Sequence, residues 1–157
     1  MVPSLPSMTG SDAGLVALVA LAVASALHLG FQLTVTMVVY PALARVDDAG
    51  WQVAHTGHSR AITPLVGVTY GALVLSVAWA LVATRNERGV AWVVLSAVGA
   101  AVAVLTTAVA AVPLHGRLSR GRDEALVGRL LKADRLRALG AVVSFVGAAL
   151  AVGTALV

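Results

Sequence analysis

The sequence predicts an all-α protein, a bundle of four transmembrane helices that forms a single integral membrane domain over residues 1–157. Three observations support this. The chain is 59% hydrophobic and only 11% charged, and its mean hydropathy is +0.93. It contains four apolar segments, each long enough for the roughly 20 residues that a helical span requires. Lysine and arginine gather in the connections beside these segments, as they do in membrane proteins.

The four predicted spans lie at about residues 14–44, 62–84, 90–112 and 136–157. The first apolar segment has no basic residue ahead of it and is too long for the apolar region of a signal peptide. We therefore expect it to remain in the mature protein as a span. Pro64 lies near the start of the second span, where we expect it to kink the helix or open its first turn.

Short amphipathic helices are predicted in the first and third connections. In the first connection, an aspartate at position 47 or 48 can cap a helix, and four residues then recur at spacings typical of one helical face: Trp51, His55, His58 and Ile62. In the third connection, Asp123 precedes a similar series: Leu126, Leu130, Ala133 and Arg137. We expect these helices to lead into the second and fourth spans.

The distribution of basic residues predicts the topology. The first connection carries Arg45 and Arg60, and the second carries Arg85 and Arg88. The third carries seven: Arg117, Arg120, Arg122, Arg129, Lys132, Arg135 and Arg137. Connections one and three share a side, so the count is nine against two. The positive-inside rule then predicts an integral plasma (inner) membrane protein, with connections one and three in the cytoplasm and both termini outside.

Composition also limits the partners and the chemistry. The net charge of +4 comes from basic residues in loops beside apolar segments, so we predict a lipid bilayer rather than nucleic acid as the partner. The chain has no cysteine, which excludes disulfides and thiolate metal ligands. Small residues recur every fourth position at Gly140, Ser144 and Ala148, a pattern that favours close helix packing and leaves room for a homo-oligomer.

Four histidines are candidates for a functional site, because ionisable groups at membrane depth are costly. A hairpin of the first two spans, at about 1.5 Å rise per residue, places His28 level with residues 66–70. The other three, His55, His58 and His115, lie nearer the loops by about three turns, or about 16 Å. We therefore expect a group of three and a separate deeper residue, rather than one site with four histidines.

The deeper polar residues form one stripe of the first span: Ser25, His28, Gln32 and Thr36. One interpretation is structural, with hydrogen bonds that join the helices through Tyr70, Thr106, Thr107 or Ser144. The other is functional, with a polar floor beneath a substrate cavity. In that case the substrate-binding residues would be His28, Gln32, Tyr70, Thr36 and Trp51. Trp51 equally suits a position at the membrane interface.

The second group is a polar cluster where three helix ends meet: His55, His58, Arg60, His115, Asp134 and Arg137. Three neutral imidazoles, His55, His58 and His115, would suit iron, copper or zinc. Histidines near membrane surfaces are also often plain interfacial residues. Asp134 and Arg137, three apart on a helix, fit a local ion pair as well as a catalytic pair.

Three short motifs resemble the anthrone oxygenase-like family of small four-helix membrane proteins: YPAL at 40–43, VPLHGRL at 112–118 and DRLRAL at 134–139. The resemblance spans most of the chain through the order and spacing of these motifs. The family more often has asparagine at the positions of His115 and Asp134. Some members oxidise polyketide anthrones to anthraquinones, and most are of unknown function. The resemblance therefore implies an oxygenase of secondary metabolism.

An anthrone oxidation needs a base that removes an activated proton, after which the electron-rich enolate reacts with dioxygen without a cofactor. A histidine, with its usual pKa of about 6.5, suits the role of the base. We predict His58 or His115 as the base and Arg60 or Arg137 as the group that stabilises the oxyanion, with Asp134 beside them. Two alternatives stay open. One is an oxygenase that uses a histidine-bound iron or copper ion. The other is a protein that binds or moves a lipophilic small molecule, or serves a partner as a membrane subunit, without catalysis.

Overall fold

The structure is a computed structural model and describes residues 10–87 and 89–157. Arg88, counted above in the second connection, lies outside these residues, as do the first nine residues of the predicted domain. Within the described chain every regular element is a helix, which confirms the predicted all-α class. Four helical segments are long and apolar enough to cross a membrane: Asp12–Ala44, Asp48–Ala83, Val90–Leu118 and Glu124–Ala155.

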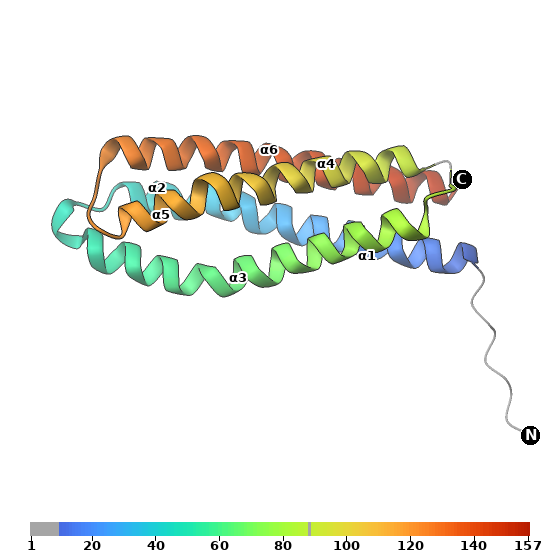
Figure 1. Cartoon of the computed structure of the whole chain (residues 1–157), viewed down its shortest axis with the longest axis horizontal. Helices are drawn as coiled ribbons and strands as arrows, with labels where there is room; N and C mark the ends of the chain where they lie inside the picture. Colours follow the sequence, from blue (N-terminus) through green and yellow to red (C-terminus); the bar gives the residue numbers. More distant parts are fainter. Residues whose placement is uncertain (1–9, 88) are drawn as a thin grey trace, which may run out of the picture.

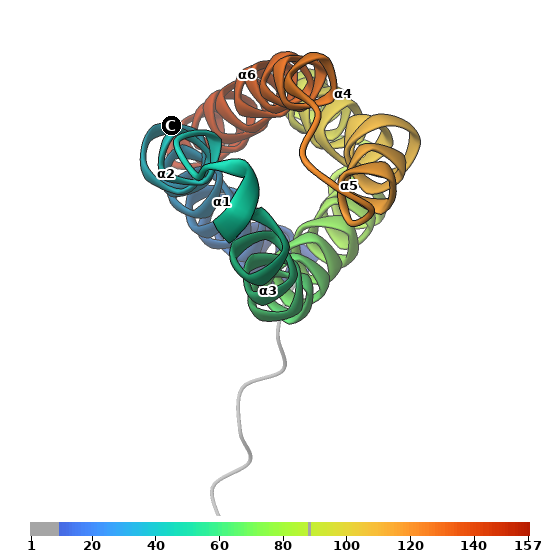
Figure 2. The same cartoon turned by 90° about the vertical axis from the view of Figure 1, so that its left-hand side faces the viewer.

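The helices follow one another in an up-and-down order (Figure 1). Their bounds are α1 Gly10–Thr34, η1 Val35–Val39, α2 Tyr40–Ala44, α3 Asp48–Ala83, α4 Val90–Thr106, η2 Thr107–Ala111, α5 Val112–Leu118 and α6 Glu124–Ala155. These elements form four rods, which are α1–η1–α2, α3, α4–η2–α5 and α6. Seen along the bundle, the four rods stand at the corners of a square, with α1 between α3 and α6 (Figure 2). Consecutive rods are therefore neighbours, and the chain needs only short connections.

The rods α4 and α6 approach most closely, because small residues line their contact. A Cβ atom added at Gly147 would lie 2.5 Å from the backbone nitrogen of Ser96, and one added at Gly140 would lie 2.7 Å from the carbonyl oxygen of Gly99. The hydroxyls of Ser96 and Ser144 also meet across this contact at 3.2 Å. The small residues predicted to pack in the fourth span do pack there, against α4.

The helices expected in the first and third connections exist, but they are not separate elements. The side chain of Asp47 accepts a hydrogen bond from the backbone N–H of Gly50 at 2.8 Å and caps α3. Asp123 caps α6 in the same way, from the N–H of Leu126 at 3.0 Å. Both helices then run on through the predicted spans, and α3 remains continuous across Pro64. At 36 residues, α3 is about 54 Å long, so it extends beyond the roughly 30 Å apolar layer of a bilayer.

Two π-helices interrupt the first and third rods at matching places. The N–H of Tyr40 bonds to the carbonyl of Val35, and the N–H of Val112 bonds to the carbonyl of Thr107, each five residues back. Each π-helix ends two residues before a proline, Pro41 or Pro113. Proline has no N–H and its ring clashes with the carbonyl four residues earlier, and a wider turn relieves that clash.

Buried polar residues lie between two apolar clusters. The cluster at the α2 and α5 end comprises Val35, Tyr40, Leu43, Trp51, Ala111, Leu118, Leu126 and Leu130. The cluster toward the other end comprises Ala17, Leu18, Leu21, Ala80, Val93, Ala148 and Ala151. Fully buried His28 and Gln32, and the charged pair Asp134 and Arg137, occupy the region between the residues of these two sets along their helices. Such a polar layer is costly in an apolar interior unless its members are paired or bind something.

Candidate functional site

His115 is the centre of a hydrogen-bonded group at the α2 and α5 end of the bundle. Its Nε2 lies 3.1 Å from the hydroxyl of Tyr40, and its Nδ1 lies 3.1 Å from Nε2 of His55. The ring of Trp51 stacks on His55 with centroids 5.3 Å apart. The ring of His58 lies 5.7 Å from His115 and 5.9 Å from Tyr40. Three segments, α2, α3 and α5, therefore place one phenol and three imidazoles together.

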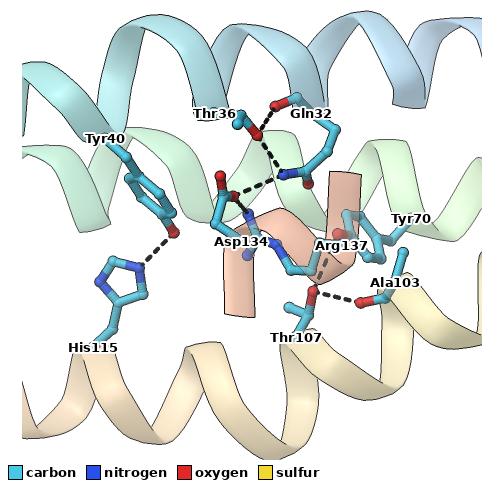
Figure 3. A network of polar contacts seen from close by, with 9 residues as sticks. All are labelled: Gln32, Thr36, Tyr40, Tyr70, Ala103, Thr107, His115, Asp134 and Arg137. Carbon is cyan, nitrogen blue, oxygen red and sulfur yellow. Dashed lines mark hydrogen bonds and ion pairs between the residues drawn. The ribbon is translucent and has the colours of Figure 1, made fainter. Parts of the chain in front are cut away.

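A second group is built around a buried ion pair (Figure 3). The guanidinium of Arg137 donates to Oδ1 of Asp134 at 2.9 Å, and the two side chains are 6% and 2% exposed. The amide of Gln32 donates to the same carboxylate oxygen at 2.7 Å and to the hydroxyl of Thr36 at 3.2 Å. The guanidinium carbon of Arg137 also lies 5.8 Å from the ring centre of Tyr40. Arg137 therefore links this ion-pair network to the histidine group.

His28 and Tyr70 form the third part of the polar layer. Their rings meet edge to face with centroids 4.6 Å apart. The hydroxyl of Thr107, in η2, donates to the hydroxyl of Tyr70 at 3.1 Å. Within the described residues, neither ring nitrogen of His28 has a hydrogen-bond partner, although both are buried. His28 is thus held by ring contact rather than by the interhelical hydrogen bond that a purely structural interpretation requires.

An apolar cavity of about 290 Å³ opens beside these groups, close to the smaller ligand pockets of proteins. Its lining includes the aromatic and ionisable residues Tyr40, His115 and Arg137. The other lining residues are Phe31, Val35, Ser59, Ile62, Thr63, Val66, Thr107, Ala111 and Val112. Both π-helices contribute to this lining, and π-turns often accompany functional sites.

A more open groove of about 350 Å³ lies on the other side of His115. It is lined by His55, Thr56, Ser59, Arg60, His115, Gly116 and Ser119. His115 and Ser59 therefore line both the cavity and the groove. His115 is thus in a position to connect the two.

The two groups of histidines that the sequence predicts are found. His28 contacts Tyr70, at the level expected from the helical rise, and the three histidines nearer the loops contact one another. Asp134 and Arg137 form a buried ion pair, as one of the two interpretations offered for them expects, and Arg137 also lines the cavity. Gln32 bonds across the bundle to Asp134, and Thr36 supports Gln32.

The residues that line the cavity in the described chain include none of the five predicted substrate-binding residues: His28, Gln32, Thr36, Trp51 and Tyr70. Arg60 is exposed and lines the outer groove, because it projects from α3 away from the bundle centre. Trp51 is buried behind His55, and its indole N–H donates to the carbonyl of Leu118 at 2.9 Å, so it supports an imidazole instead of walling the cavity. Trp51 therefore belongs to the histidine group through its ring contact with His55.

The predicted metal ligands come together but do not form a ligand set. No three histidine, aspartate or glutamate side chains in residues 10–87 and 89–157 are placed to hold one metal ion. The facing nitrogens of His55 and His115 point at each other, and the second nitrogen of His115 bonds to Tyr40. Both ring nitrogens of His115 are thus engaged in hydrogen bonds.

Tyr40 is a central residue of this candidate site that the sequence-based candidates omit. It contacts His115, His58 and Arg137 and lines the cavity. The signal was present in the sequence, because Tyr40 continues the stripe of the first span one further step of four residues beyond Thr36.

The arrangement combines an apolar cavity with a hydrogen-bonded phenol and imidazole on one wall and a buried guanidinium beside them. Imidazole can accept and return a proton near neutral pH. A guanidinium in a site shielded from water strongly stabilises a developing negative charge. No family model matches the chain, and no curated protein or solved structure matches it either.

Proposed function

We propose that this protein is a membrane-embedded oxygenase that oxidises a lipophilic aromatic compound, of the anthrone or quinol type, with dioxygen. The observation that carries the proposal is the mostly apolar cavity that Tyr40, His115 and Arg137 line together. A base and a cation on one wall suit a substrate that becomes an anion during the reaction. The resemblance of the three short motifs to the anthrone oxygenase-like family supports the same chemistry.

The cavity suits a flat, apolar molecule that arrives from the membrane. Its lining includes Ile62 and Val66 of α3 and Val112 of α5, with Ala111 between the rods. The contact between α3 and α4 is the weakest of the four neighbouring pairs in the bundle, so this side offers the easiest entry from lipid. A polycyclic phenol would place its ring edge between these apolar side chains and its oxygen toward Arg137.

The proposed reaction begins when the activated CH₂ group of the substrate loses a proton to Nε2 of His115, directly or through the hydroxyl of Tyr40. The electron pair left on carbon delocalises onto the carbonyl oxygen of the substrate and gives an enolate. Dioxygen then takes an electron from the enolate and forms a C–O bond, and the peroxide recovers the proton. Loss of water gives the ketone, so that CH₂ and O₂ become C=O and H₂O.

Arg137 is the proposed stabiliser of the enolate oxygen. In the free protein its charge is balanced by Asp134 at 2.9 Å, which offsets the cost of burying a cation in an apolar region. The carboxylate of Asp134 bonds through Oδ1 to both Arg137 and Gln32, so the guanidinium is held in place before the substrate binds. Electrostatic stabilisation is most effective when the charged group needs no rearrangement.

The proposed location is the plasma (inner) membrane, with lipid as the surrounding partner. Nine basic residues in the first and third connections against two in the second favour a cytoplasmic position for the histidine end of the bundle. The termini and the turn at 84–89 then face the outside.

The test is oxygen consumption by the purified full chain in lipid nanodiscs with dihydroxyanthrone, followed together with the absorbance of the anthraquinone product. We expect turnover above the spontaneous oxidation in empty nanodiscs. His115→Phe and Arg137→Met should each reduce kcat/KM at least about 100-fold, because a base and an oxyanion donor each contribute about that much or more. Arg117→Gln, an exposed arginine two residues after His115, is the matched control and should retain full activity.

Each alternative gives a different result in this assay. Tight binding of dihydroxyanthrone without oxygen uptake would defeat the oxygenase and favour a protein that binds or moves lipophilic molecules. Stoichiometric iron or copper in the active preparation, found by elemental analysis, would favour metal-dependent oxidation.

A further inference from the structure

His115 separates two compartments of different character. On one side lies the apolar cavity, which it lines together with Tyr40 and Arg137. On the other side lies the more open groove, which it lines together with His55. The hydrogen bonds of His115 follow the same division, with Nε2 toward Tyr40 and Nδ1 toward His55, each at 3.1 Å. The three side chains therefore form a continuous line of hydrogen bonds from the cavity to the groove.

The atoms allow this line to carry a proton. When the hydroxyl of Tyr40 donates to Nε2 of His115, Nδ1–H of His115 donates to Nε2 of His55, and the neutral ring of His55 keeps its own proton on Nδ1. In the opposite orientation every donor and acceptor exchanges places. Either way the line ends at Nδ1 of His55, which is buried and has no hydrogen-bond partner in the part of the chain that the structure describes. His55 lines the groove, and a water molecule between the groove and this buried nitrogen would complete the line.

We infer that Tyr40, His115 and His55 form a proton-transfer chain between the cavity and the groove, with His55 as its outer member. This inference rests on the proposed function, because it assigns a path to the proton that the substrate releases. One proton enters at the Tyr40 end and another leaves Nδ1 of His55, and the reverse movement returns a proton for the peroxide. No bond other than O–H and N–H bonds is made or broken in this transfer.

Charge explains why such a chain is useful. Arg137 already places one positive charge beside the cavity, and its guanidinium carbon lies 5.8 Å from the ring of Tyr40. A second positive charge on His115 would be repelled by it in a region shielded from water. Transfer to His55 moves the charge one residue further from Arg137, toward the open groove. The proton is thereby stored while dioxygen reacts.

The first test removes the outer member alone. His55→Ala should lower kcat for dihydroxyanthrone about 10- to 100-fold with little change in KM, because the cavity wall is intact. Since the variant opens space on the groove, added imidazole should restore most of the lost kcat. His55→Phe keeps a ring to stack on Trp51, so it should stay folded, show the same loss and resist imidazole.

The matched control is Thr56→Ala, whose side chain lines the same groove next to His55. It should behave as the wild type, with and without imidazole. Wild-type kcat in both His55 variants, or a loss in His55→Ala that imidazole leaves unchanged, would overturn the chain.

The second test does not depend on turnover. Nitrogen NMR of the full chain, with ¹⁵N-labelled histidine in nanodiscs, reports which ring nitrogens carry protons. In a continuous chain, Tyr40→Phe should shift the nitrogens of His55 as well as those of His115. If the ¹⁵N signals of His55 are unchanged in Tyr40→Phe, the proposed proton-transfer chain is wrong. A shift at His55 in a protein that fails to oxidise dihydroxyanthrone would support the proton-transfer chain and contradict the proposed oxygenase activity.

Discussion

Individual polar atoms without partners mark the site at the scale of the residue. Such buried atoms with no hydrogen bond in the described chain belong to His28, Gln32, His55, His58, Ser59, Arg122 and Arg137. Apart from Arg122, all of these lie in or beside the cavity, the groove or the polar layer. Buried polar atoms are nearly always satisfied in folded proteins, because an unpaired one costs about 1–3 kcal/mol. Their concentration here therefore favours a place that water or a substrate completes.

The ion pair of Asp134 and Arg137 gives the first prediction. Asp134→Leu leaves a buried guanidinium unpaired and should lower the free energy of unfolding by about 3–5 kcal/mol. The double variant Asp134→Leu/Arg137→Met removes both charges and should recover most of that loss, although it should remain inactive. Unfolding in mixed micelles, followed by circular dichroism, measures the difference. Losses that simply add in the double variant would show that the pair is not coupled.

His28 gives a second prediction at this scale. His28→Leu replaces a buried ring that has two unpaired nitrogens with an apolar side chain of similar size, so stability should stay the same or rise by about 1 kcal/mol. Binding of dihydroxyanthrone should weaken if His28 is part of the polar floor. Thermal unfolding and ligand titration of the same sample check both statements. A stability loss above about 1 kcal/mol would instead mean that the ring contact with Tyr70 outweighs the cost of the two unpaired nitrogens.

The two π-helices are the decisive feature at the scale of the element. A π-turn places one more residue in the turn than an α-helix does, and so changes the direction of side chains on one side of it. In the first rod this happens between Gln32 and Tyr40, and in the third between Thr107 and His115. The ion-pair network and the histidine group are thereby brought to the same cavity.

Deletion of one π-helix residue tests this account. Val38 is 62% exposed, so its removal should convert η1 into an α-helix, keep the packing on both sides and leave a folded bundle. The cavity wall would change, and dihydroxyanthrone oxidation should fall below detection. Deletion of Leu27, equally exposed but inside α1, is the control. It rotates every later residue of the rod by about 100° and should prevent folding, as size-exclusion chromatography in detergent would show.

The elements differ in how far the sequence predicts them. Hydropathy locates all four spans, and a carboxylate before an amphipathic series is a local signal that predicts a cap at Asp47 or Asp48 and marks Asp123, although only the structure selects Asp47. The connection helices merge with the spans because no strong breaker separates them, and Pro64 alone does not stop α3. The π-helices leave only an indirect trace in Pro41 and Pro113, since a single extra residue does not disturb an apolar run.

For the site residues too, the sequence predicts what lies within one helix but not the contacts between helices. Spacing within one helix groups His55 with His58, and the rise per residue separates them from His28. Which face of each helix meets which neighbour depends on packing between rods, and this is why Arg60 lies in the outer groove and Tyr40 on the cavity wall. Partners on different helices, such as Gln32 and Asp134, follow only from the assembled bundle.

At the scale of the whole molecule, the absence of cysteine in the sequence allows a clean test of the proposed orientation. Single substitutions Glu87→Cys and Arg120→Cys place a thiol in exposed positions of the second and third connections. A membrane-impermeant maleimide should label Glu87→Cys in intact cells and Arg120→Cys only after the membrane is opened. The reverse pattern would place the histidine end outside the cell.

The matched π-helices divide the chain into two halves with the same order of elements. Each half runs through a rod, a π-helix, a proline, an aspartate cap and a long helix. His58 and Asp134 occupy equivalent positions, eleven residues after their capping aspartates. Tyr40 and His55 come from the first half, and His115 and Arg137 come from the second. Neither half alone supplies all four side chains, so the candidate site forms only where the two halves pack together.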